Sequence, residues 1–265
     1  MNRSLPTEFV YQAFALLISI ILVHAFYVSV VRPNAEAVLS EQARMQEMEP
    51  GSVPTRSVWV IIRDVEQEWC FILMLWALAI IGYKTVNTTR ERRLLDEDLL
   101  HVSEGMRILP EDTRDLARQV ESMPEPARSR LVPRVLLTAL HRFASTRSIE
   151  AVMASVKSVC ETEGDRLDSE LSMIRYIAWA IPSIGFIGTV RGIGEALAQA
   201  HKAVEGDITG VTMSLGVAFN STLVALLLSI VLMFIVHQLQ LQQEKLVLDT
   251  ETYADRNVVR HLRVQ

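Results

Sequence analysis

The sequence predicts an all-α polytopic membrane protein with four transmembrane helices and long helical cytoplasmic extensions. Half of the 265 residues are hydrophobic, yet four stretches contain no Lys, Arg, Asp or Glu: 9–31, 69–83, 176–190 and 208–236. A helix that crosses a hydrocarbon layer of about 30 Å needs about 20 nearly uncharged residues. Charge is dense between these stretches, and no useful strand alternation occurs. This separation of uncharged stretches from densely charged segments excludes an ordinary soluble enzyme.

The first two stretches are membrane helices rather than targeting or core segments. Segment 9–31 follows Arg3 as a signal peptide would, but it is too long, and Arg32-Pro33 stands where a cleavage site needs small residues. The second span extends to residue 89, because Lys84 can lift its amine to the headgroups. Trp69 marks its other end as an interfacial anchor.

Basic residues predict the orientation of the spans. Segment 84–175 contains 15 Lys and Arg, whereas 32–68 contains 4 against 7 acids and the turn 191–207 contains 2. By the positive-inside rule, the long middle segment and both termini are cytoplasmic. The predicted organisation is a short N-terminus with the first span (1–31), a periplasmic helical loop (32–68), the second span (69–89), a cytoplasmic helical domain (90–172), a core of the third and fourth spans with a short periplasmic turn (173–237), and a cytoplasmic helical tail (238–265).

The segments outside the spans have helical signals. Residues 35–49 are helix formers, and the Pro-rich run 50–54 ends that helix. In the middle segment, 89–109 is expected to be helical, and Pro110-Glu-Asp begins a further helix. Segments 132–145 and 148–173 continue at helical period, the latter without a break into the third span.

The third and fourth spans each concentrate small residues on one face. At 100° per residue, an arc of the third span gathers Pro182, Gly185, Thr189, Gly192 and Ala196, and an arc of the fourth gathers Ser214, Ala218, Ser221, Thr222, Ala225 and Ser229. Small faces of this kind pack membrane helices together, as does the Gly188-xxx-Gly192 pair. A hydroxyl on each face and a proline in midspan also fit a polar or ionic path. Both readings remain open from the residues alone.

Neither face contains an acid. Protons cross membranes along ionisable side chains, yet 176–190 and 208–236 have no Asp, Glu or Lys. If the protein conducts ions, a partner helix must supply the carboxylate. Arg191 and Glu195, four residues apart just beyond the apolar run, are expected to form an ion pair at the outer mouth.

Motifs of enzymes and cofactor sites are missing from the sequence. Gly192-Ile-Gly194 lies in a membrane helix and follows no strand, so it is not a dinucleotide fingerprint. Cys70 and Cys160 have no metal-ligand spacing. We therefore expect no enzyme activity, no cofactor and no metal site, and we interpret the basic cluster 90–93 as a topology signal and not as a nucleic-acid site.

The run Ala180-Ile-Pro182-Ser-Ile-Gly185-Phe-Ile-Gly188-Thr189-Val190-Arg-Gly192-Ile resembles the signature helix of the MotA/TolQ/ExbB proton-channel family, P-x-x-G-x-x-G-T-V-x-G. The run Ala218-Phe-Asn-Ser-Thr222-Leu-Val-Ala-Leu is similar to the helix that follows it in the family. The resemblance is specific over about 163–244. The four-span layout is similar to the MotA branch and not to the three-span TolQ and ExbB branch.

The resemblance implies a homopentamer around two copies of a single-span partner (MotB/TolR/ExbD-like) that brings a membrane Asp, in the lipid bilayer of a bacterial inner membrane. It implies that Thr189 and Thr222 line the path of H⁺ or Na⁺. It also implies that Pro182 is a kink and that the following residues form a close-packed surface: Gly185, Gly188 and Gly192 on one helix, with Ala218, Ser221 and Ala225 on the next. The leading hypothesis is a channel-forming, stator-type subunit of an ion-driven motor. The alternative is a non-conducting membrane scaffold.

Two positions and one loop depart from the family pattern. TolQ and ExbB types have a glutamate five residues before the threonine of the last span, and here that position is Val217. Arg191 follows the Gly-Thr-Val motif where an uncharged residue is more usual. The outer loop 34–68 is long for a flagellar stator. These differences argue against an ion route through a glutamate of the fourth span and against the flagellum as the destination.

Overall fold

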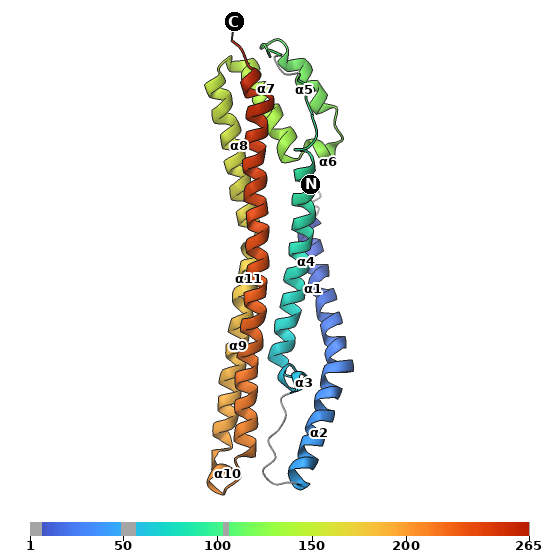
Figure 1. Ribbon diagram of the computed structural model, residues 1–265, viewed down its shortest axis with the longest axis vertical. Coiled ribbons are helices and arrows are strands. Elements are labelled where there is room, and N and C mark those ends of the chain that lie inside the picture. The colour runs from blue at the N-terminus through green and yellow to red at the C-terminus, as the bar shows by residue number, and fades with distance from the viewer. Residues whose placement is uncertain (1–6, 49–56, 103–105, 265) are drawn as a thin grey trace, which may run out of the picture. The chain divides into compact units, whose positions relative to one another are not determined.

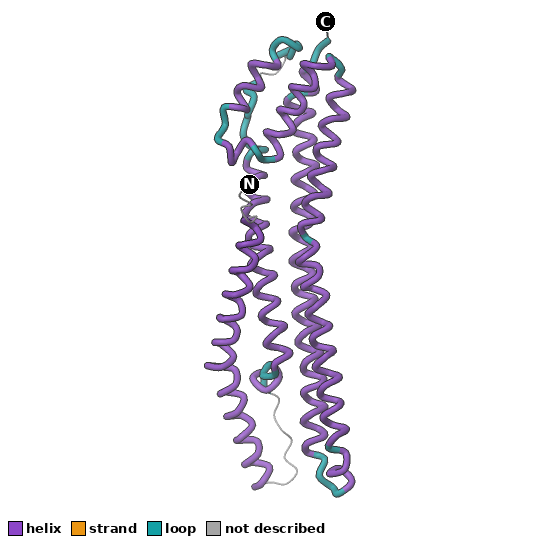
Figure 2. The backbone as a smooth tube through the Cα atoms, turned by 180° about the vertical axis from the view of Figure 1, so that it is seen from behind, coloured by secondary structure: helices purple, strands orange, loops and turns teal. Residues whose placement is uncertain are grey.

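The computed structural model describes residues 7–48, 57–102 and 106–264, apart from the side chains of 46 and 47. Within these ranges the chain forms helices and no strand (Figure 2). Four helical segments in them are long and apolar enough to cross a membrane: Glu8–Met45, Val65–Arg93, Ile149–Ala198 and Thr209–His261. The predicted all-α polytopic fold is confirmed.

The chain divides into two compact units. The first unit comprises residues 1–81 and 173–236, and the second comprises 82–172 and 237–265. The first unit therefore contains most of the residues of the four uncharged stretches. The second contains most of the charged middle segment and the tail.

In the first unit, the helix of the first span continues past residue 31. Helix α1 (Thr7–Phe26), a π-helical turn η1 (Tyr27–Val31) and α2 (Arg32–Met48) follow one another without a break. A proline normally interrupts a helix because it lacks an N–H, but here the π turn changes the hydrogen-bond register just before Pro33. The Asn34 amide also donates to the Val30 carbonyl oxygen at 2.7 Å. The predicted break at 50–54 lies outside the described residues.

Helix α3 (Val58–Ile61) is followed by α4 (Val65–Arg93), which is longer than the predicted span 69–89. Glu66 and Glu68 lie in the first turn of α4 and three arginines in its last turn. Acids at a helix N-terminus and bases at its C-terminus interact favourably with the helix dipole, so the charges that end the apolar run also extend the helix. Within the first unit, the Trp76 indole N–H donates to the Gln12 carbonyl oxygen of α1 at 2.9 Å.

The third and fourth spans form an antiparallel pair. Helix α9 (Ser172–Ala198) is joined through the short α10 (Ala200–Val204) to the 49-residue α11 (Thr209–Asn257). Figure 1 shows the first half of α11 running alongside α9. Helix α9 continues through Pro182.

The second unit has its own hydrophobic core. It contains α5 (Thr113–Glu121), α6 (Glu125–Arg128), α7 (Leu131–Thr146), α8 (Ile149–Glu170), the end of α11 and the 3₁₀ turn η2 (Val259–His261). Leu136, Leu140 and Phe143 of α7 are fully buried in this core. The helix expected at 89–109 is wrong beyond Arg93. Leu94, Leu100 and Ile108 are buried instead, at spacings that no helix face reproduces, because the chain folds across the core.

The amine of Lys84 does not lie where the sequence predicts it. Its side chain is only 4% exposed, and Nζ lies 2.9 Å from Oε2 of Glu170 in α8. The amine is therefore paired within the second unit and does not extend to lipid headgroups. A buried amine needs such a partner, and the sequence alone does not reveal one that is 86 residues away.

Candidate functional site

The two small-residue faces meet each other inside the first unit. A Cβ added to Gly185 would overlap with Ala225, and one added to Gly192 would lie 2.7 Å from the Ser214 carbonyl oxygen and 2.8 Å from the Ala218 nitrogen. These approaches leave no room for a side chain at either glycine. The predicted close-packing residues are thus brought together: Gly185, Gly188, Gly192, Ala218, Ser221 and Ala225 are buried, and Pro182 is half-buried.

Thr189 and Thr222 face each other across this contact. Their hydroxyl groups form a hydrogen bond with each other. The Thr189 hydroxyl lies 3.1 Å from the Ala218 carbonyl oxygen, and the Thr222 hydroxyl lies 3.2 Å from the Gly185 carbonyl oxygen. Both residues are half-buried. A hydroxyl oxygen has two lone pairs, so each of these oxygens keeps at least one free to accept a further hydrogen bond or to bind a cation.

Ser229 compensates for the missing N–H of Pro182. Four residues before the proline, the Ala178 carbonyl oxygen cannot receive its usual helical bond. The Ser229 hydroxyl of α11 donates to this oxygen at 3.0 Å. Sequence reasoning placed Ser229 on the small face but did not connect it with the proline, because that connection depends on the register between the two helices.

The expected pair of Arg191 and Glu195 is present, but it is the smaller part of a network. Arg191 Nη1 lies 2.9 Å from Glu195 Oε1. Its Nε and Nη2 bond both oxygens of Glu66 in α4, at 2.7 and 2.8 Å. This two-pronged geometry is the strong form of an arginine–carboxylate interaction. Glu66 was assigned to the outer loop, and sequence reasoning missed it.

The first turn of α4 is polar and buried, with contacts to α1, α2, α9 and α11. Glu66, Gln67 and Glu68 are all buried, and Gln67 is completely inaccessible. Glu68 contacts His24 of α1 at 2.6 Å and Arg32 of α2 at 2.7 Å. The available signal was three polar residues between Val65 and Trp69, a short polar break at the edge of an apolar run. By composition alone it reads as a solvated helix end.

Gln67 connects this turn with the small face of α11. Its amide nitrogen donates to the Ile61 carbonyl oxygen at 3.0 Å and, over a longer 3.4 Å, to the Ser221 hydroxyl. Ser221 directly precedes Thr222. A polar side chain of α4 therefore reaches the residue next to the threonine pair.

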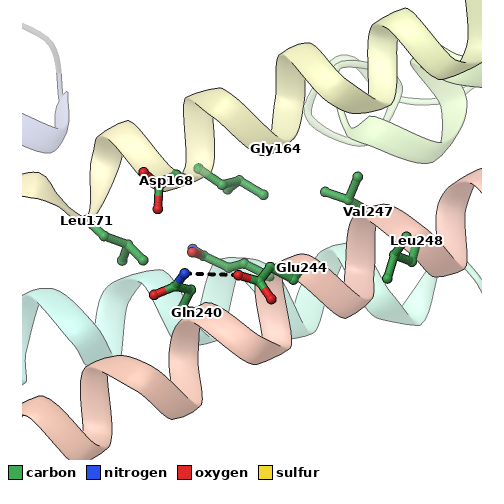
Figure 3. A pocket seen from close by; sticks show the side chains of 9 residues that line it. Gly164, Asp168, Leu171, Gln240, Glu244, Val247 and Leu248 are labelled. Carbon is green, nitrogen blue, oxygen red and sulfur yellow. Dashed lines mark hydrogen bonds between the residues drawn. The ribbon is translucent and has the colours of Figure 1, made fainter.

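The described residues form hollows in both units. One in the first unit has a volume of about 440 Å³ and is lined by polar residues that include Arg32, Arg63, Asp64 and Arg191. One in the second unit, about 300 Å³, lies between α8 and α11 and is lined largely by apolar surface, with the Gln240–Glu244 hydrogen bond at its edge (Figure 3). Of these two hollows, only the one in the first unit lies next to the first turn of α4, which contacts the small faces.

The comparisons with known proteins agree with this geometry. The model of the MotA/TolQ/ExbB proton channel family matches residues 127–252, which include both small faces and both threonines. No match was found among curated proteins or among solved structures. The segment 127–252 of this multi-pass membrane protein therefore matches the MotA/TolQ/ExbB proton channel family, the family that the motif of the third span predicted.

Proposed function

We propose that the chain is the channel-forming, stator-type subunit of an ion-driven motor complex in a bacterial inner membrane. Five copies would surround two copies of a single-span partner that brings a membrane Asp, with both termini of the chain in the cytoplasm. The observation that supports this proposal is the Thr189–Thr222 pair. Two half-buried hydroxyls with free lone pairs lie where the helices that define a proton channel family touch.

The charges around the pair support the proposal that a partner supplies the acid. The described parts of α9 and α11 next to the threonines carry no carboxylate, and α4 brings one, that of Glu66, close to Gly188. Both oxygens of Glu66 are bonded to Arg191. A carboxylate held in this way by a guanidinium is a poor proton carrier at neutral pH, since the pair favours its ionised form.

The energetics of such a motor are adequate. A proton that moves down about 150 mV releases roughly 3.5 kcal/mol. This is enough to change the ratio of two packing states several hundredfold. The ion step can therefore drive a change of helix packing in the assembly.

One observation favours a non-conducting scaffold as the second candidate. The small faces of α9 and α11 pack on each other within a single chain, and the threonine hydroxyls bond carbonyl oxygens of the opposite helix. Close packing alone explains such contacts in a membrane protein. The two functions differ in whether the hydroxyls are needed for ion flow.

Proton uptake into vesicles separates the two functions. The chain is co-purified with a single-span partner that carries a membrane Asp, reconstituted with a pH-sensitive dye inside, and energised by a potassium diffusion potential. Replacement of both threonines by valine (Thr189→Val with Thr222→Val) keeps the shape and removes both hydroxyls. We expect the initial rate to fall at least tenfold, because about 1.4 kcal/mol, the value of one hydrogen bond, corresponds to a factor of ten.

Ser183→Ala is the matched control. Ser183 is also a hydroxyl residue of α9, and its side chain bonds the Trp179 carbonyl oxygen of its own helix at 3.1 Å. The initial rate of proton uptake by the Ser183→Ala complex should stay within twofold of wild type. A double valine variant that conducts like wild type would remove the hydroxyls from the mechanism, and absence of flux from every complex would favour the scaffold.

A further inference from the structure

The first turn of α4 contains an acceptor that the fold leaves unused. Gln67 is completely buried, and its amide nitrogen makes two hydrogen bonds, but its carbonyl oxygen Oε1 has no partner within the described ranges. An unsatisfied buried amide oxygen is costly, and such groups are rare in folded proteins. The unsatisfied oxygen of Gln67, close to the small face of α11, therefore indicates a site for a hydrogen-bond donor.

Asp64 provides a second unused acceptor on the same turn. It directly precedes α4 and lies three residues before Gln67 in the chain. Oδ2 of Asp64 is buried and has no partner among the residues described, while Oδ1 lies 3.6 Å from Nε of Arg63. Burial raises the pKa of Asp64 above its usual value, although Arg63 and Arg191 oppose the shift.

One acceptor lines a polar hollow, and the other contacts the small face of α11. Asp64 lines the hollow of about 440 Å³, together with Arg32, Arg63 and Arg191. Gln67 is three residues further along the chain and contacts Ser221, the neighbour of Thr222. The hollow at Asp64 is thus three residues along the chain from Gln67, and Gln67 contacts the neighbour of Thr222.

We propose that Asp64 and Gln67 form the entrance station of the ion path, where their free oxygens accept hydrogen bonds from a hydrated monovalent cation before it reaches Thr189 and Thr222. This inference rests on the proposed function. The donor is the O–H of hydronium in a proton-driven complex, or of a water bound to Na⁺ in a sodium-driven one. Both present the same chemistry to a carbonyl or carboxylate oxygen.

The test measures ion uptake by the complex of the full chain and its partner in proteoliposomes. One arm applies a proton gradient without sodium and follows an internal pH dye, and the other applies a ²²Na⁺ gradient at constant pH. Gln67→Leu removes the acceptor without adding charge. The uptake rate is expected to fall about tenfold in whichever arm conducts, and that arm identifies the ion.

Gln243→Leu is the matched control. Gln243 belongs to the second unit, is only 4% exposed and also has an unpartnered Oε1. Both changes replace a buried glutamine by leucine, and Gln67→Leu also removes the two hydrogen bonds of its amide nitrogen, so the melting temperature in detergent is measured for both variants to confirm that each is folded. Only Gln67→Leu should slow ion uptake. Equal rates for the two variants, or a rate for Gln67→Leu within twofold of wild type, would overturn the proposal.

A second variant keeps the test decisive if Gln67→Leu does not fold. Asp64→Asn preserves the size of the side chain and remains a good residue to precede a helix, yet it replaces one acceptor oxygen by a donor. It should slow uptake severalfold in the same arm, and an unchanged rate would overturn the proposal. Failure of the proposed function looks different, because the wild-type complex then conducts in neither arm.

Discussion

Pro182 and Ser229 are coupled through one carbonyl oxygen. The proline deprives the Ala178 oxygen of its helical donor, and the Ser229 hydroxyl replaces that donor from the neighbouring helix. In hydrocarbon no water can satisfy an orphaned carbonyl, so the serine stabilises the proline-containing helix as much as it links two helices.

Ser229→Ala is therefore expected to lower the free energy of unfolding by about 1–3 kcal/mol, the cost of a buried unsatisfied acceptor. In a Pro182→Ala background, residue 182 regains its N–H and can bond the Ala178 oxygen. The same serine change should then cost less than about half as much. Reversible unfolding in mixed micelles measures both values as a double-mutant cycle.

Ser183→Ala serves as the reference, because its hydroxyl bonds the Trp179 oxygen, whose usual helical donor is the backbone N–H of residue 183 itself. It should change stability by less than about 0.5 kcal/mol. An equal cost of Ser229→Ala with and without the proline would show that the two residues are independent.

Residue patterns predicted one part of the site and not the other. The threonines and the small residues follow from a 100° layout of each helix, since that layout depends only on local sequence. Glu66 and Gln67 do not, because their significance comes from Arg191 and Ser221, which are 125 and 154 residues away. Near the end of an apolar run, buried polar residues and solvated ones have the same composition.

At the scale of the helix, the contact between α9 and α11 depends on glycine at particular positions. A Cβ at Gly185 would overlap with Ala225 and lie 3.1 Å from the Ser221 carbonyl oxygen, whereas one at Gly194 would meet nothing within 4 Å. Both glycines lie in the same helix, and neither has a positive φ angle. Their difference is therefore one of space.

Gly185→Leu should separate the two helices, with a loss of about 1–3 kcal/mol or more from overpacking, while Gly194→Leu should be tolerated. Thermal unfolding in detergent and the yield of monodisperse protein measure this difference. Equal melting temperatures for the two variants would mean that the faces do not pack as closely as the structure has them.

Sequence patterns predicted the existence of the helices better than their ends. The four uncharged stretches lie in the four long apolar helices. The helices are longer than these stretches. Charged residues form the first and last turns of Val65–Arg93, and the π turn at Tyr27–Val31 allows the helix to continue past Pro33. The end of helix at Arg93 depends on the core of the second unit, where Leu94 and Leu100 are buried, and that core is not visible in local periodicity.

For the whole molecule, the distribution of acids decides what the chain can do alone. Glu66 is bonded to Arg191, and Glu68 is bonded to His24 and Arg32, so both of these buried carboxylates are paired with a base. Asp64 differs from them, because its buried Oδ2 has no partner among the described residues. The threonine pair offers lone pairs but no group that titrates near neutral pH. Under the proposed function, the carrier for protons comes from another polypeptide.

The purified chain in liposomes should accordingly conduct no protons above the leak of empty vesicles, and addition of the single-span partner during reconstitution should raise the rate at least tenfold. A partner whose membrane Asp is replaced by Asn should assemble without restoring flux, because an amide neither takes up nor releases a proton at neutral pH. Native mass spectrometry of the same samples reports whether five copies assemble and whether two partners join them. Rapid proton uptake by the chain alone would contradict this division of roles, since the proton would then have to move along groups that the chain itself provides. Asp64 would be the first of these groups to test by substitution.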